Sequence, residues 1–251
     1  MVEVVTERLR AAGCVFAEDE ARLLIAAGGS LDTLVARRVA GEPLEYVLGW
    51  ARFCGRRIAV EPGVFVPRRR TELLAREAVA AARAIAAPVV VELCCGAAAV
   101  AAVVAVEVAG TRVCAADVDP AAVRCARRNL RTGDVYVGDL YAALPESLRG
   151  HVDVLVANAP YVPTEAIALM PPEARLHEPL VALDGGPDGL DVQRRVIADA
   201  PSWLVPGGGA LLVETSVEQA PVTAALMTDA GLRARIVRDR EVDGTAVIGA
   251  R

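Results

Sequence analysis

Hydrophobic positions recur along this chain with two different periods, and the change between them divides it into three parts. Residues 1–45 have apolar side chains at helical spacing in three runs separated by glycines. Residues 46–70 contain the run 53–60, which is followed by Glu-Pro-Gly and predicts a β-hairpin. The predicted N-terminal helices cover residues 2–12, 19–27 and 31–38.

From residue 71 to residue 251 the pattern alternates between buried strands and helices. Predicted strands cover 89–93, 112–117, 135–137, 152–157, 210–214, 233–237 and 245–248. Predicted helices cover 71–85, with Thr71 as a candidate N-cap, and 97–109, 120–131, 190–204 and 218–230. Alternation of this kind predicts an α/β fold with a mostly parallel, doubly wound sheet and helices on both faces. We therefore expect three units: helices over 1–45, a hairpin linker over 46–70 and the sheet domain over 71–251.

Composition and charge narrow the class of protein. The 251 residues are 54% hydrophobic, yet Glu92 and Glu107 interrupt the longest apolar runs, so no membrane span is expected. The first residues lack a basic region followed by an apolar one, so the default expectation is a cytoplasmic protein. A net charge of −5 argues against nucleic-acid binding driven by bulk charge. Six cysteines without a C-x-x-C pair and two histidines make a metal site unexpected.

Chemistry-bearing residues follow the first two predicted strands of the sheet domain. The strand 89–93 contains Glu92 and leads through Cys94 and Gly96 into a helix, an arrangement that suits a nucleotide-like cofactor. Asp117 ends the next strand, at the spacing of an acid that accepts both ribose hydroxyls. The alternative is that Asp117 is a solvated turn acid and Asp119 caps the following helix.

A third acid follows the short strand 135–137. Asp139 would lie beside the adenine edge of such a cofactor, and the alternative is an ordinary loop acid.

The strand 152–157 is followed by Asn158-Ala159-Pro160-Tyr161. This tetrapeptide resembles the Asn-Pro-Pro-Tyr loop of methyltransferases that alkylate amide or exocyclic amino nitrogens. The Asn158 carbonyl and a neighbouring backbone carbonyl would accept both N–H bonds of such a group, and Tyr161 would stack on its plane. That arrangement would orient a poorly nucleophilic nitrogen toward an electrophilic methyl. The alternative is an ordinary turn.

Several further blocks carry a resemblance to one family. They are RVAGEPLEYVLG at 38–49, FVPRRRTE at 65–72, EPLVALDGGPDGL at 178–190 and LVPGG at 204–208. Together they resemble the bacterial HemK/PrmC group of protein-(glutamine-N5) methyltransferases, over residues 35–250. The block at 178–190 is the more specific one, because DNA and RNA amino-methyltransferases share Asn-x-Pro-Tyr.

This resemblance implies a Rossmann-like class I methyltransferase fold with a seven-stranded sheet and S-adenosyl-L-methionine as cofactor, leaving S-adenosyl-L-homocysteine as product. It implies a protein partner with an exposed glutamine, such as the Gly-Gly-Gln loop of a peptide-chain release factor, recognised with help from the N-terminal helices. The implied cofactor-binding residues are Glu92, Cys94, Gly96, Asp117, Val118, Asp139, Leu140 and Asn158. The implied substrate-binding residues are Arg68, Thr71, Ala159, Pro160 and Tyr161, of which Pro160 and Tyr161 join Asn158 as catalytic residues.

The chain also departs from the family pattern. The glycine-rich turn, usually Gly-x-Gly-x-Gly, has Cys94, Gly96 and Ala98 at its three key positions. We expect the Ala98 methyl to crowd the methionine moiety or to strain the turn by about 1–3 kcal/mol, whereas Cys94 is milder if its φ is negative. Ala159 replaces the first proline of the loop, with a modest expected effect.

The remaining departures concern the substrate. Arg69 and Arg70 replace a proline and an acid, and the N-terminal region is short for the group, which leaves room for a substrate other than a release factor.

Three rival functions remain open from the sequence. The first is a nucleobase amino-methyltransferase, for which a basic groove would be expected. A non-catalytic protein with a decayed cofactor turn is suggested by the alanines at 97–99. A dinucleotide oxidoreductase is disfavoured by the glycine pattern and leaves Asn-x-Pro-Tyr without a role.

Overall fold

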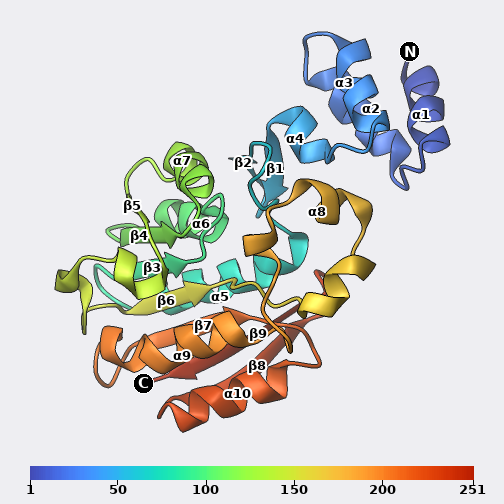
Figure 1. Cartoon of the computed structure of the whole chain (residues 1–251). Helices are drawn as coiled ribbons and strands as arrows, with labels where there is room; N and C mark the ends of the chain where they lie inside the picture. Colours follow the sequence, from blue (N-terminus) through green and yellow to red (C-terminus); the bar gives the residue numbers. More distant parts are fainter.

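The computed structural model describes all residues, 1–251, and the N-terminal helices form a small body beside a larger sheet domain (Figure 1). Helices α1 (Val2–Ala11), α2 (Ala17–Ala26) and α3 (Leu31–Val39) enclose their own core, in which Leu9 and Val35 are fully buried. Helix α4 (Leu44–Leu48) spans the predicted boundary between residues 45 and 46. It leads into the antiparallel hairpin of β1 (Trp50–Phe53) and β2 (Arg56–Ala59).

The larger part is a seven-stranded sheet in which every predicted strand is present. Its strands are β3 (Val89–Leu93), β4 (Arg112–Asp117), β5 (Asp134–Val137), β6 (Val154–Ala157), β7 (Ala210–Glu214), β8 (Arg233–Asp239) and β9 (Gly244–Ala250). They lie in the order β5-β4-β3-β6-β7-β9-β8, and only β9 runs antiparallel to its neighbours. The predicted fold class is therefore confirmed.

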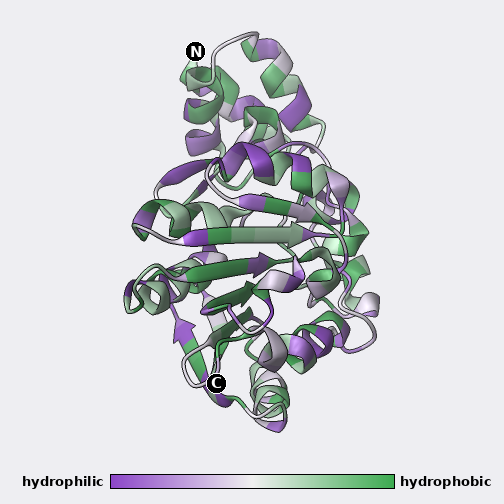
Figure 2. Cartoon of the chain, turned by 90° about the vertical axis from the view of Figure 1, so that its left-hand side faces the viewer, coloured by the Kyte–Doolittle hydropathy of each residue, from purple (hydrophilic) through white to green (hydrophobic).

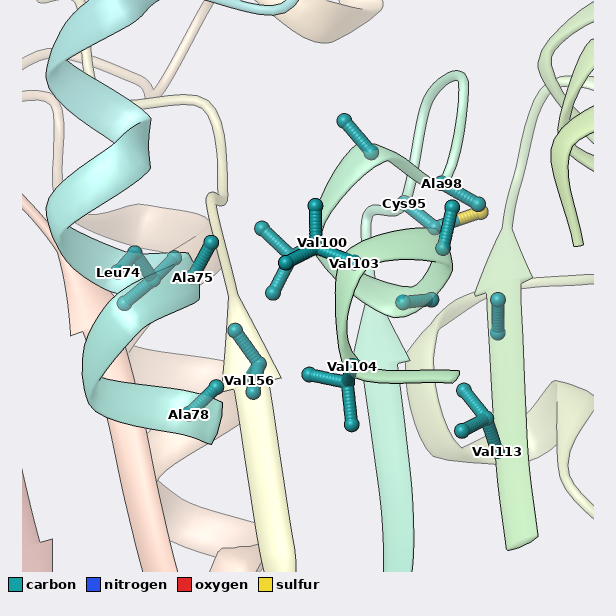
Figure 3. Close-up of a cluster of buried hydrophobic side chains, with 14 of the residues drawn as sticks. Leu74, Ala75, Ala78, Cys95, Ala98, Val100, Val103, Val104, Val113 and Val156 are labelled. Carbon is teal, nitrogen blue, oxygen red and sulfur yellow. The ribbon is translucent and has the colours of Figure 1, made fainter. Parts of the chain in front are cut away.

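Side chains of successive strand residues enter two separate cores, because they point to opposite faces of the sheet. Val90 packs with α5 (Glu72–Arg83), α6 (Ala99–Glu107) and α7 (Pro120–Asn129), part of which Figure 3 shows. Its neighbour Val91 packs with α9 (Asp191–Trp203) and α10 (Ala220–Asp229) on the other face. The central strands are accordingly hydrophobic along most of their length (Figure 2).

Short helices fill the connections and were not predicted, since three to six residues carry too little periodicity. They are α8 (Pro172–His177) and the 3-10 helices η1 (Arg69–Thr71), η2 (Leu140–Ala143), η3 (Glu146–Leu148), η4 (Thr164–Leu169) and η5 (Leu180–Ala182). Thr71 occupies the predicted N-cap position of α5. Thr71 precedes the helix, but its side chain makes no capping bond, because η1 already leads the backbone into the helix.

Contacts across the two parts place α8 against the N-terminal helices. The buried Arg38 binds Glu20 of α2 at 2.6 Å and Glu173 of α8 at 2.7 Å. The Tyr46 hydroxyl donates to the carbonyl oxygen of Val64 at 2.8 Å and lies 3.4 Å from that of His177. None of the helices combines the length and the hydrophobicity that a membrane span requires.

The strand order predicts where a ligand would bind. Strand β3 has β4 on one side and β6 on the other, so the chain reverses its direction of winding at β3. Open α/β sheets bind ligands outside the carboxyl ends of the strands at such a point.

Candidate active site

A cavity of about 370 Å³ opens at this switch point. Its size lies within the range of small-molecule sites. All of the residues that the resemblance assigns to the cofactor and substrate sites line it: Arg68, Thr71, Glu92, Cys94, Gly96, Asp117, Val118, Asp139, Leu140, Asn158, Ala159, Pro160 and Tyr161. The fold thus brings together segments from β3, β4, β5, β6 and the start of α5.

The turn after β3 keeps a left-handed backbone at all three glycine positions of the family pattern. The φ angles are +52° at Cys94, +52° at Gly96 and +56° at Ala98. The expectation of a milder effect at Cys94 depended on a negative φ and is therefore wrong. The expected crowding by Ala98 is also wrong, because its side chain is fully buried in the hydrophobic cluster of Figure 3 and does not line the cavity.

Asp117 organises this turn from the end of β4. One carboxylate oxygen accepts the Gly96 N–H at 2.8 Å and the other accepts the Asp119 N–H at 2.9 Å. Asp117 is half-buried, which raises its pKa, and these two hydrogen bonds give it a structural role in the turn. A carboxylate has about four acceptor sites, which leaves one on each oxygen for a pair of hydroxyl groups. The prediction that Asp119 caps the following helix is confirmed, because Asp119 accepts the Ala121 N–H of α7 at 2.8 Å.

Two further carboxylates lie at the same end of the cavity. Glu92 is buried and accepts the Ala101 N–H at 2.7 Å, so it caps α6, which has no side-chain cap of its own. Burial raises the pKa of Glu92 to about 8. Asp139 is exposed and pairs with Arg195 at 2.6 Å. At neutral pH Glu92 is thus largely protonated and Asp139 is neutralised by Arg195, so Asp117 is the carboxylate that this end of the cavity offers to a ligand.

The Asn158 loop presents unpaired hydrogen-bond acceptors to the cavity. The Asn158 amide donates to Thr71 Oγ1 at 3.4 Å, which leaves its carbonyl oxygen without a partner in the chain. The backbone carbonyl oxygens of Ala159 and Pro160 accept no hydrogen bond either, and that of Pro160 packs against Gly185. Because unpaired buried acceptors are costly, this cluster is suited to a ligand with N–H groups.

The block at 178–190 forms the wall behind this loop. Val162 pairs with Asp184 in an isolated parallel bridge, and the Gln219 side chain donates at 3.0 Å to the carbonyl oxygens of both Tyr161 and Asp188. A Cβ at Gly189 would lie 2.3 Å from the Tyr161 carbonyl oxygen, so only glycine permits this approach.

The same block also reaches the start of α5. Glu178 is buried, accepts the Val66 N–H at 3.1 Å and binds Arg68 at 2.6 Å. The motif that was most specific in the sequence therefore holds two other parts of the site in place.

Sequence reasoning missed three residues around Tyr161. The Tyr161 hydroxyl donates to Glu214 Oε1 at 3.2 Å, and Arg70 lies 3.4 Å from the same oxygen. Arg70 lines the cavity, and Gln219 fixes the loop backbone. Only Arg70 had a signal in the sequence, as a basic residue where the family motif has an acid. Glu214 and Gln219 lie at and after the end of strand β7, far from the loop along the chain.

Comparison with known proteins finds relatives that are named as methyltransferases. Residues 56–173 match the family described as methyltransferase small domain. The release factor glutamine methyltransferase of Geobacter sulfurreducens is 37% identical over 202 residues, which cover 79% of this chain and 69% of that protein. The 4-amino-L-phenylalanine/4-methylamino-L-phenylalanine methyltransferase of Streptomyces pristinaespiralis is 39% identical over 232 residues. These cover 83% of this chain and 79% of that protein.

A solved structure shows the same fold. It is the T. thermophilus 16S rRNA N2 G1207 methyltransferase in complex with AdoMet and guanosine, with a TM-score of 0.55 and 19% identity, over 80% of this chain and 49% of that one. At this identity the likeness concerns the fold alone.

Proposed function

The chain belongs to the family of the release factor glutamine methyltransferases, and from this premise we propose that it methylates the side-chain amide nitrogen (N5) of a glutamine in a protein. The observation that carries the proposal is the set of unpaired acceptors at Asn158, Ala159 and Pro160, beside a cavity whose other end holds the Asp117 carboxylate.

The end of the cavity that holds Asp117 fits S-adenosyl-L-methionine. This cofactor supplies an electrophilic methyl group on a positively charged sulfonium. The left-handed turn at Gly96 allows the backbone to approach it, and the free acceptor sites of Asp117 match the two ribose hydroxyls. We assign Val118, Asp139 and Leu140 to the adenosine moiety. Glu92 acts indirectly, by capping the helix that follows the turn.

The acceptor end would hold the amide. Its nitrogen is a poor nucleophile because the lone pair is delocalised into the carbonyl group. The Asn158 carbonyl oxygen and a backbone carbonyl of Ala159 or Pro160 would accept both N–H bonds and direct the lone pair toward the methyl group. Catalysis of this kind rests on orientation and fixed dipoles, so no strong base is required.

A protein substrate is supported by the surface beside the cavity. Met170, Pro179 and Val181 line the cavity, and the segment 164–182 that contains them exposes large apolar side chains. These exposed residues are Leu169, Leu176, Leu180 and Val181. Single exposed apolar residues are ordinary on a protein surface, but a group of them beside a binding cavity is not. This segment is therefore suited to contact with a macromolecule.

We propose that the partner is a peptide-chain release factor and that helices within residues 1–45 take part in its recognition. The ion pair between Arg38 and Glu173 couples these helices to α8. We retain the boundaries 1–45, 46–70 and 71–251 as proposed functional units.

The test is methylation of purified release factor by the purified chain with S-adenosyl-L-methionine. Mass spectrometry of the digested product should find one added methyl group on the glutamine of the Gly-Gly-Gln loop, and Asn158→Ala should slow its appearance by about a hundredfold or more. Calorimetry with S-adenosyl-L-homocysteine establishes that the cofactor site is competent. Tight binding of this product without methylation of any release-factor glutamine would reject the target.

A second candidate is N-methylation of an aromatic amine on a free amino acid. The Streptomyces relative named for that activity covers more of this chain than the Geobacter protein does. Supplying 4-amino-L-phenylalanine in place of the release factor distinguishes the two.

A further inference from the structure

Arg70 differs from its two neighbouring arginines in its surroundings. The side chain of Arg68 is committed to Glu178 at 2.6 Å and lies over the Phe65 ring. Arg69 is exposed and does not line the cavity. Arg70 lines the cavity, with 45% of its side chain exposed, and it precedes Thr71, the residue that binds the Asn158 amide.

The guanidinium of Arg70 is only partly engaged. Its Nε lies 3.4 Å from Glu214 Oε1, and its central carbon lies 5.8 Å from the centre of the Tyr161 ring. The Tyr161 hydroxyl is the other group of the chain that lies within hydrogen-bonding range of the guanidinium. A guanidinium has five N–H donors in a fixed fork, so contacts with Glu214 and Tyr161 leave about three donors free.

Glu214 explains why this cation can be kept at the site. Its side chain is almost fully buried, and its Oε2 atom has no hydrogen-bond partner. The pair of Arg70 and Glu214 is close to neutral overall, while the fork of Arg70 remains at the cavity wall. The cavity therefore holds the Asp117 carboxylate at one end and offers cationic donors beside Tyr161.

We propose that Arg70 binds a carboxylate of the substrate and selects methyl acceptors that have an acidic group close to the methylated nitrogen. The proposal rests on the proposed N-methyltransferase function. A planar fork pairs with a carboxylate through two parallel hydrogen bonds, which gives orientation as well as affinity. The carboxylate has two possible sources: an acidic side chain next to the target glutamine of a protein, or the α-carboxylate of a free amino acid.

The experiment uses the full chain and two matched pairs of probes. The first pair is a peptide with glutamine beside glutamate and its isosteric partner with glutamine beside a second glutamine. The second pair is 4-amino-L-phenylalanine and its carboxamide. Binding to the chain saturated with S-adenosyl-L-homocysteine is measured by calorimetry, and kcat/KM is measured with S-adenosyl-L-methionine.

Wild type should prefer the acidic member of one pair by about ten- to a hundredfold, the usual range for a hydrogen-bonded charge. Arg70→Gln should remove the preference without changing the affinity for S-adenosyl-L-homocysteine, and Arg70→Lys should restore part of it. Arg69→Gln is the matched control and should retain the full preference. Thermal unfolding of each variant shows whether it is folded.

The outcomes separate this inference from the proposed function. Preference within the peptide pair supports a protein carboxylate, and preference within the amino-acid pair supports an α-carboxylate. Carboxylate-dependent binding of a peptide that is never methylated supports the role of Arg70 but contradicts glutamine methylation. The inference is overturned if wild type shows equal affinity and equal kcat/KM for the two members of each pair. It is also overturned if Arg70→Gln retains the wild-type preference.

Discussion

The strained turn after β3 allows a quantitative test of the structure. Ala98 has a φ of +56°, whereas its neighbour Ala97 is not among the residues with positive φ. Both side chains are buried, with 2% of Ala97 and none of Ala98 exposed. Ala98→Gly and Ala97→Gly therefore remove the same buried methyl group, and only the first relieves a left-handed backbone.

The expected magnitudes follow from three contributions. Loss of a buried methyl group costs about 0.8 kcal/mol, and the added freedom of glycine in the unfolded chain costs about 0.4–1 kcal/mol. Relief of the left-handed conformation stabilises the folded variant by about 1–2 kcal/mol. Ala98→Gly should thus lie within about 1 kcal/mol of wild type, while Ala97→Gly should be destabilised by about 1–2 kcal/mol.

Urea unfolding followed by circular dichroism measures both free energies, provided that the m-values agree. The difference between the two variants, about 1–2 kcal/mol, isolates the strain at Ala98. Because the Ala98 methyl does not line the cavity, Ala98→Gly should change the Kd for S-adenosyl-L-homocysteine by less than about threefold. Equal destabilisation by the two substitutions would refute the left-handed assignment, and a large gain in affinity would show that the methyl group does obstruct the cofactor.

Three further predictions address the cavity. Asn158→Ala should cut kcat by about a hundredfold or more with an almost unchanged cofactor Kd, since it removes an oriented acceptor at the methylated nitrogen; equal loss of both would contradict that role. Asp117→Ala should instead weaken S-adenosyl-L-homocysteine binding by about ten- to a hundredfold in calorimetry, because the ribose acceptors and the bond to the Gly96 N–H are lost together; an unchanged Kd would remove Asp117 from the site. Glu92, whose pKa is raised to about 8, binds a proton in the folded chain that it releases when unfolded, so its contribution to stability falls as pH rises from about 4.5 to 8. Glu92→Gln should therefore gain stability relative to wild type by up to about 1.4 kcal/mol per pH unit across that window, and parallel pH profiles in urea unfolding would exclude the raised pKa.

Local pattern was sufficient for the fold and for the place of the site. The seven strands follow from apolar runs whose length and alternation are properties of neighbouring residues, and their bounds agree with prediction to within about two residues. Because the carboxyl ends of parallel strands share one edge, the order of elements along the chain was enough to predict that residues such as Glu92, Asp117 and Asn158 meet there.

Tertiary structure alone decided how those residues are supported. The contacts of Glu214 with Tyr161 and of Glu178 with Val66 join positions that are 53 and 112 residues apart, and no local periodicity encodes such pairs. The same is true of the Ala98 side chain, which lies beside Cys95 in the buried hydrophobic cluster rather than in the cavity. Sequence spacing specifies which backbone a residue can adopt, but the free energy of its side chain depends on neighbours that only the packed fold brings within contact.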